Sequence, residues 1–206
     1  TVRVWSSASK SLLKLVSLNV AEDGEQLDLD PHTGELSDGA RLRSVSISPQ
    51  DLFIAVGAKD GTLRIINSKD FTVIKHIKER NKWISEIKFN PNNSLMAVGS
   101  HDGYIDVYMV PDFRRKYALR KHSSFITHFD WSLDSSYLQS NCGAYELLYW
   151  DMTQGKQLTN GANQLRDETW DEITCVYNWS TQGIWEEGLD GTDINMVSRS
   201  TTKLFG

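Results

Sequence analysis

Histidine, cysteine and aspartate are the residues of this chain whose types suit metal binding or catalysis. The chain has five histidines and two cysteines, and a zinc site needs such ligands at short, regular spacing. His122 and His128 are separated by six positions (128 − 122 = 6) and have no cysteine pair beside them. We therefore expect no metal site and no cofactor, and we expect Cys142 and Cys175 to be buried thiols in a reducing compartment.

Asp60, Asp102 and Asp190 share a second pattern, because each stands directly before a glycine. Paired carboxylates can act as a general acid and base, but Asp-Gly is also a preferred sequence for a tight β-hairpin turn. The first two pairs lie between runs of alternating apolar and polar residues, which favours the turn. We expect turn roles for the six residues of these pairs: Asp60, Gly61, Asp102, Gly103, Asp190 and Gly191.

Motifs of known catalytic chemistry are absent from the sequence. It contains no glycine-rich phosphate loop, no G-x-S-x-G nucleophile elbow and no H-E-x-x-H zinc motif. A calcium loop around Thr192 and Asp193 would need alternating oxygen ligands, and the spacing there lacks them. We therefore expect a binding protein without catalytic residues, not an enzyme.

The elements that carry these residues form an internal repeat. VGAKDGTLRIIN at 56–67 returns as VGSHDGYIDVYM at 98–109, an offset of 42 (98 − 56 = 42), and ELLYWD at 146–151 ends a third unit. Apolar and polar residues alternate in each unit, as in strands with one buried face. Units of four short strands at this period are typical of WD-type propellers. We predict an all-β WD-repeat β-propeller, as an incomplete arc of about four to five blades.

The same spacing predicts how the chain is divided. Residues 1–20 are expected to end a preceding blade, and residues 21–40 to form an acidic surface insertion. Residues 41–151 hold three divergent repeats, and residues 152–206 hold a long loop and the start of further blades. A ring of seven such blades needs roughly 300 residues, so we expect this chain to be part of a larger propeller.

Charge is distributed unevenly along the chain, whose net charge is −5. Residues 21–40 hold seven acids and residues 167–193 hold eight, with no lysine or arginine in either stretch. Residues 64–121 carry twelve lysines and arginines against six acids, a local charge of +6 (12 − 6 = 6). This balance argues against nucleic acid as a partner, and no apolar run reaches the ~20 residues of a membrane helix. The basic centre suits an acidic protein partner.

Three stretches resemble the echinoderm microtubule-associated-protein-like family more specifically than the repeat does. They are HSSFITHFDWSLDSSYL at 122–138, YELLYWD at 145–151 and GIWEEGLDGTDINMVSRS at 183–200. Glu186 and Ala144 depart from the family pattern. The resemblance implies tandem atypical propellers that engage tubulin or microtubules, in the cytoplasm, on the microtubule cytoskeleton or in the axoneme. It also implies that His122 is similar to the propeller histidine that hydrogen-bonds within its blade.

A candidate partner-binding surface follows from the basic stretch FRRKYALRKH at 113–122. Its cations could meet an acidic protein surface, and the alternative is a solvated outer strand. A tryptophan within RDETWDE could anchor a partner, and the alternative is packing in the blade core. The candidate residues are Arg114, Arg115, Lys116, Arg120, Lys121 and Trp170. The alternative function is a general WD-repeat adaptor that assembles other proteins without contacting tubulin.

Overall fold

The computed structural model describes residues 2–5, 8–16, 41–184 and 194–198. Nearly all regular structure within these ranges is β-strand, with one short α-helix and one short 3₁₀ helix late in the chain. No helix in this part of the chain is long and apolar enough for a membrane span. The elements are β1 (Val2–Trp5), β2 (Leu12–Val16), β3 (Leu42–Ile47), β4 (Phe53–Ala58), β5 (Leu63–Asn67), β6 (Val73–Ile77), β7 (Ile84–Phe89), β8 (Leu95–Ser100), β9 (Tyr104–Met109), β10 (Arg115–Arg120), β11 (Ile126–Trp131), β12 (Tyr137–Cys142), β13 (Leu147–Asp151), β14 (Lys156–Gln157), α1 (Gly161–Gln164) and the 3₁₀ helix (Trp179–Ile184).

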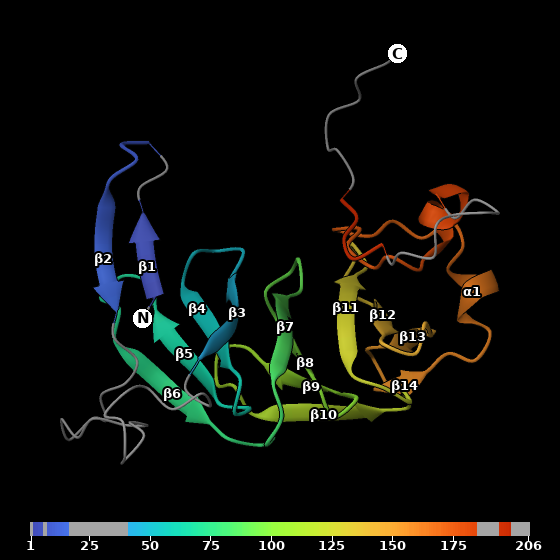
Figure 1. Ribbon diagram of the computed structural model, residues 1–206, viewed down its shortest axis with the longest axis horizontal. Helices are drawn as coiled ribbons and strands as arrows, with labels where there is room; N and C mark the ends of the chain where they lie inside the picture. Colours follow the sequence, from blue (N-terminus) through green and yellow to red (C-terminus); the bar gives the residue numbers. More distant parts are fainter. Residues whose placement is uncertain (1, 6–7, 17–40, 185–193, 199–206) are drawn as a thin grey trace.

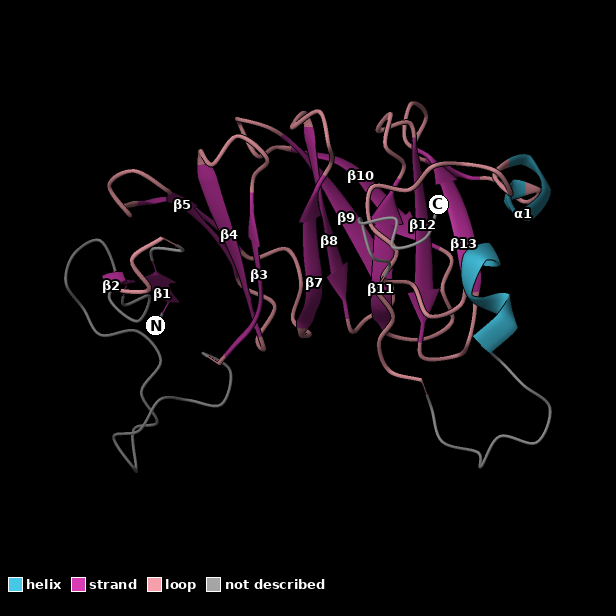
Figure 2. Ribbon diagram, turned by 90° about the horizontal axis from the view of Figure 1, so that it is seen from above, coloured by secondary structure: helices cyan, strands magenta, loops and turns pink. Residues whose placement is uncertain are grey.

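The strands form antiparallel sheets in which each strand pairs with the next in sequence. The first blade is β3-β4-β5-β6, the second is β7-β8-β9-β10 and the third is β11-β12-β13-β14, while β1 and β2 form a two-stranded sheet. Figures 1 and 2 show the three blades side by side in sequence order, and β7 contacts both β3 and β11. This arrangement confirms the predicted incomplete β-propeller. Because β14 is the fourth strand of the third blade, that blade extends beyond residue 151.

The three blades also share one register, in keeping with the repeat in the sequence. The pairing of the first two strands shifts once in every blade, near the start of the first strand. These irregularities recur with the period of the repeat (84 − 42 = 42, 126 − 84 = 42), at Leu42/Ser44, Ile84/Glu86 and Ile126/His128. The chain therefore builds the same supersecondary unit three times.

The hydrophobic core lies between neighbouring blades. Ile65 of the first blade and Ile87 of the second belong to one buried cluster. Ile105 of the second blade packs in another cluster with Phe129 and Trp131 of the third. Since each blade is buried by its neighbour, stability arises from stacking, as in other repeat proteins.

The face of the first blade that points away from the second is only partly covered. Val2 and Val4 of β1 pack against Ile54, whereas the side chains of Val45 and Ile47 on β3 are 59% and 57% exposed. The short sheet β1-β2 thus occupies the place of a neighbouring blade. Residues 21–40, the predicted acidic insertion, lie outside the described part of the chain.

Candidate partner-binding surface

Two of the predicted Asp-Gly pairs form the turns between the second and third strands of the first two blades. Gly61 and Gly103 have φ angles of +88° and +83°, which glycine adopts most easily. The carboxylate of Asp60 accepts hydrogen bonds from the backbone N–H and hydroxyl of Thr62, at 2.9 and 2.7 Å. Asp102 accepts one from the backbone N–H two positions later, at 3.3 Å. In both turns the aspartate holds the hairpin through local bonds.

The third pair, Asp190 and Gly191, lies outside the described residues, as does most of the phrase that contains it.

Burial by itself raises the pKa of Asp60, but hydrogen bonds from Lys78 and Thr62 outweigh it and the net pKa is lowered. A carboxylate held in its ionised form by a lysine is suited to structure, not to proton transfer at neutral pH.

The basic stretch lies on and beside β10, the outermost strand of the second blade. Arg114 pairs with Asp112 at 2.6 Å, and Arg115 contacts Glu79 at 3.0 Å and Asp106 at 3.6 Å. The positive charge that composition suggests is therefore partly neutralised at these two arginines.

Three other cations of this stretch point outward. Lys116, Arg120 and Lys121 are all exposed. Lys116 lies over the ring of Tyr117 at 5.0 Å, and Arg120 lies over the ring of Tyr104 at 5.1 Å. Lys116 lies where the pairing of β10 with β9 shifts, between Arg115 and Tyr117, whereas Arg120 lies in the regular part of the strand. These three are the members of the predicted surface best placed to meet a partner.

Trp170 occupies a buried position. Its side chain is 6% exposed, it packs with Tyr149, Leu165 and Ile173, and its backbone forms an isolated bridge with Ser132. A surface anchor needs an exposed ring, so this placement agrees with the core alternative given above. The ring instead fixes the segment after α1 against the third blade.

His122 takes part in a chain of hydrogen bonds inside the third blade. Its Nε2 lies 2.7 Å from the hydroxyl oxygen of Ser140, which also accepts a bond from Trp150 Nε1 at 2.8 Å. Its Nδ1 lies 3.2 Å from Glu146. Burial lowers the pKa of His122 although Glu146 opposes the shift. The ring therefore links the loop before β11 to β12 and β13.

Among the residues that the structure describes, one group has side chains of the types that can bind a metal ion. It consists of His122, Cys142 and Glu146, whose ligand atoms lie within 4.8 Å of one another. The Cys142 thiol donates to Glu146 at 3.0 Å, and the Ser123 backbone N–H donates to the same oxygen at 2.9 Å. These bonds lower the pKa of Glu146 to about 2. Because hydrogen bonds already engage each ligand atom, we interpret the group as a structural network. In the second blade the equivalent of His122 is Arg80 (122 − 42 = 80), which binds Asp106 at 2.6 Å.

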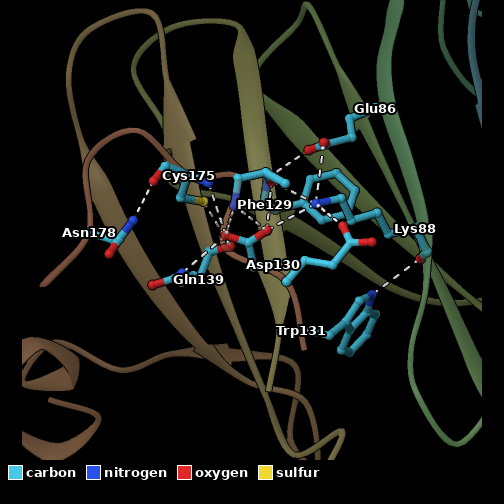
Figure 3. Close-up of polar contacts among 10 residues, drawn as sticks. Glu86, Lys88, Phe129, Asp130, Trp131, Gln139, Cys175 and Asn178 are labelled. Carbon is cyan, nitrogen blue, oxygen red and sulfur yellow. Dashed lines mark hydrogen bonds and ion pairs between the residues drawn. The ribbon is translucent and has the colours of Figure 1, made fainter. Parts of the chain in front are cut away.

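A buried ionic network links the first strands of the second and third blades, and sequence reasoning missed it. Figure 3 shows Lys88 and Asp130 at its centre, with Nζ and carboxylate 2.9 Å apart. The exposed fractions of the two side chains are 14% and 0%. Asp130 also accepts bonds from the Thr174 hydroxyl at 2.6 Å and the Cys175 backbone N–H at 3.0 Å. The network therefore joins two blades to the segment that follows α1.

Two glutamates complete this network. Glu86 accepts a bond from the Phe129 backbone N–H at 2.7 Å and lies 3.5 Å from Lys88 Nζ. Glu172 lies 3.0 Å from the same nitrogen. Burial raises the pKa of Glu86 to about 7 despite the attraction of Lys88. For Asp130 the same burial effect is outweighed by Lys88 and Thr174, so its pKa is lowered.

One signal in the sequence could have revealed the pair. The separation of Lys88 and Asp130 equals the period of the repeat (130 − 88 = 42), so they stand at the same position of successive first strands. Residues at equivalent positions of neighbouring blades lie close together, and these two carry opposite charges. Ser46 holds that position in the first blade (88 − 42 = 46). A comparison of the repeats that looks for opposite charges at equivalent positions, and not only for similar residues, would find this contact.

Blades of four antiparallel strands, packed face to face in an arc, define the protein as part of a β-propeller. The family model of the echinoderm microtubule-associated protein second beta-propeller matches residues 1–205. The chain therefore belongs to the echinoderm microtubule-associated protein family, in agreement with the resemblance of its motifs.

Individual relatives support the same assignment. Echinoderm microtubule-associated protein-like 2 of Homo sapiens is 42% identical over 162 residues, which is 77% of this chain and 25% of the relative. Echinoderm microtubule-associated protein-like 4 of Xenopus laevis is 37% identical over 156 residues, which is 74% of this chain and 17% of the relative. The chain thus spans a quarter or less of the length of these relatives.

Proposed function

We propose that this chain is a non-catalytic propeller scaffold of a microtubule-associated protein, and that it contributes to binding tubulin or microtubules in the cytoplasmic cytoskeleton. One observation carries the proposal: the chain belongs to a family whose relatives are named as microtubule-associated proteins. The rigid blades supply a platform on which loops and outer strands are held in place.

The exposed cations of β10 offer a physical route for this binding. Lys116, Arg120 and Lys121 are exposed, while Arg114 and Arg115 are engaged by acids of the same blade or its neighbour. Charges at the rim of an interface mainly raise the association rate and make binding sensitive to salt. An acidic protein surface is therefore the partner that suits this strand.

Co-sedimentation of the full-length protein with microtubules tests the proposal. Charge reversal of Lys116, Arg120 and Lys121 to glutamate should weaken binding, most clearly at low salt, where the Debye length is long. The matched control reverses three exposed lysines outside this stretch, Lys10, Lys69 and Lys156, to glutamate, so that the change in net charge is the same. Equal binding of the triple variant and the wild type over a salt series would remove β10 from the contact.

The general adaptor is the other outcome of the same assay. A folded full-length protein that never sediments with microtubules, but is recovered with other proteins, would favour an adaptor and refute the proposal. Other protein partners are compatible with both functions, since a propeller can present several surfaces.

A further inference from the structure

The loop between β10 and β11 presents a serine hydroxyl group beside two cations. Ser123 is exposed, as are Arg120 at the end of β10 and Lys121 in the loop. The two cations stand three and two positions before the serine, and the sequence has no aspartate or glutamate between residues 113 and 129. The hydroxyl group therefore lies in a stretch of chain whose charged residues are all basic.

The second blade differs at the equivalent positions. Asn81 stands in place of Ser123 (123 − 42 = 81), and Glu79 stands in place of Lys121 (121 − 42 = 79). The loop before β7 thus has neither the hydroxyl group nor the pair of cations. Since both loops lead into the first strand of a blade, the repeat itself does not require this combination.

One carboxylate fastens the loop to the third blade. The backbone N–H of Ser123 donates to Glu146 Oε2 at 2.9 Å, and its hydroxyl donates to Glu146 Oε1 at 2.8 Å. The Glu146 side chain is 33% exposed, so both bonds lie near the surface. His122, the residue before the serine, is 1% exposed and contacts Ser140 in the interior. The position of the hydroxyl group is therefore coupled to a buried chain of hydrogen bonds.

The loop can open without unfolding a blade. Residues 121–125 belong to no strand. The contacts that hold them include those of His122 and Ser123 and a bond from the Gly143 N–H to the Phe125 carbonyl at 2.9 Å. Exposed loops open locally at a lower free-energy cost than global unfolding. Such an opening gives an enzyme access to the backbone on both sides of the hydroxyl group.

We infer that Ser123 is a phosphorylation site for a protein kinase that selects basic residues before the acceptor serine. Arg120 and Lys121 suit the acidic substrate groove of such a kinase, since kinases distinguish substrates by their charge pattern. The Ser123 Oγ attacks the γ-phosphorus of ATP, so that a new O–P bond forms and the bond from the γ-phosphorus to the bridging oxygen breaks. ADP leaves, and the hydroxyl proton passes to the catalytic aspartate of the kinase.

Phosphorylation turns the bond that closes the loop into a repulsion. Hydrogen bonds from Cys142 and Ser123 lower the pKa of Glu146 to about 2, so its carboxylate is ionised at neutral pH. A phosphoserine carries a charge of about −1.5 to −2, and its esterified oxygen has no proton to donate to Glu146. The phosphate therefore displaces the loop from Glu146, and its charge offsets those of Arg120 and Lys121.

Phosphorylation of the full-length protein tests the site. The probe is the catalytic subunit of cyclic-AMP-dependent protein kinase with ATP, and mass spectrometry of proteolytic peptides locates the phosphate. We expect phosphate on Ser123 and its loss from that peptide in Ser123→Ala. Arg120→Gln with Lys121→Gln should slow phosphorylation of Ser123 about tenfold. Lys69→Gln with Lys156→Gln is the matched control, because it removes two exposed lysines elsewhere and should leave the rate unchanged.

Amide hydrogen exchange tests the opening of the loop. Residues 121–125 should exchange about tenfold or more faster in the phosphorylated protein than in the unmodified protein. Ser123→Ala should give a smaller increase, because it loses the hydroxyl bond to Glu146 but adds no charge. The equivalent residues 79–83 before β7 are the internal control, and their exchange should not change.

Several results would overturn the inference. They are the absence of phosphate from Ser123, phosphate on Ser124 in its place, or equal phosphorylation rates in the two pairs of glutamine variants. Unchanged exchange of residues 121–125 after phosphorylation would overturn the opening of the loop. Circular dichroism melts check the fold of each variant, and the comparison of phosphorylated with unmodified protein needs no substitution.

Co-sedimentation with microtubules is a separate readout, and it alone rests on the proposed function. The phosphorylated protein should sediment less than the unmodified protein at low salt, because the phosphate offsets two cations of the β10 surface. If the unmodified protein does not sediment, the proposed function is refuted while the phosphorylation and exchange results stand. If both forms sediment equally, the inferred effect of the phosphate on the β10 surface is wrong.

Discussion

Replacing Asp130 with asparagine tests whether the network of Figure 3 holds the second and third blades together. The carboxylate is fully buried and 2.9 Å from Lys88 Nζ, and it accepts bonds from Thr174, Cys175 and Gln139. Asparagine has nearly the same shape but no charge, and its NH₂ group would face donors. The substitution therefore leaves Lys88 buried with weaker compensation.

The magnitude follows from the burial of both partners. Removing one member of a buried ion pair costs about 3–5 kcal/mol. Glu86 at 3.5 Å and Glu172 at 3.0 Å still attract Lys88, so we expect the lower end, about 3 kcal/mol. For a domain of this size each kcal/mol lowers the melting temperature by about 2–4 °C. The expected decrease is about 6–12 °C.

Urea unfolding and thermal melts at neutral pH provide the measurement. Asp167→Asn is the matched control, since Asp167 is exposed and loses the same charge. The double variant Lys88→Met, Asp130→Leu should cost less than the sum of its single changes, because apolar residues can replace a buried pair. A loss from Asp130→Asn below about 1 kcal/mol, or equal to that of Asp167→Asn, would refute the reasoning.

The pH dependence adds a second check on the same residue. The folded-state pKa of Asp130 is lowered, so its contribution is present above the unfolded pKa and is lost as pH falls through the folded pKa. The gap between wild type and Asp130→Asn should therefore be wide at neutral pH and narrow in acid. A gap that stays constant down to acid unfolding would contradict the ionic explanation.

Three further substitutions probe other contacts. Burial raises the pKa of Glu86 in the folded protein to about 7, so ionisation of this carboxyl destabilises the fold. The Glu86→Gln variant should therefore become more stable relative to the wild type as pH rises from about 5 to 8. Parallel pH profiles of the two proteins would contradict this. Gly61→Ala should lower the free energy of unfolding by about 1–3 kcal/mol, and by more than Gly103→Ala does. The added Cβ would lie 2.3 Å from a carbonyl oxygen at position 61 and 3.0 Å from one at position 103. Urea unfolding of both variants measures the difference. Ser140→Ala should cost about 1–3 kcal/mol because Trp150 and His122 lose their shared partner, whereas exposed Ser180→Ala should be silent in the same melts.

The fold was predictable because local signals and the global repeat agree. Two Asp-Gly turns, separated by one period of the repeat (102 − 60 = 42), predict a hairpin in each of the first two units. Alternating apolar and polar residues on both sides of each turn predict the strands of that hairpin. The third unit is more divergent, with Asn141 to Tyr145 in place of the clear turn sequence, yet it builds the same sheet. Packing between blades decides its structure where local turn sequence does not.

The polar contacts were less predictable because they depend on which side chains meet across blades. Counting charges over the basic centre gives a surplus, but Arg115 is engaged by Glu79, and three strands separate these two residues in the sequence. The segment after α1 has no repeat to guide it, so the bonds from Thr174 to Asp130 could not be inferred from spacing. Burial of Trp170 likewise depends on how that segment folds back on the third blade.

Departures from the repeat separate into two physical kinds. At the position of Ser46, the second and third blades carry Lys88 and Asp130, and the departure is compensated because the two charges satisfy each other in the interior. At the position of Lys59 and His101, the third blade carries Gly143, and Phe125 lies against it, still exposed beside a pocket. A compensated departure stabilises the contact between blades. At the surface of the third blade, the Phe125 ring takes the space that a side chain at position 143 would occupy, so this departure is compensated by shape and not by charge.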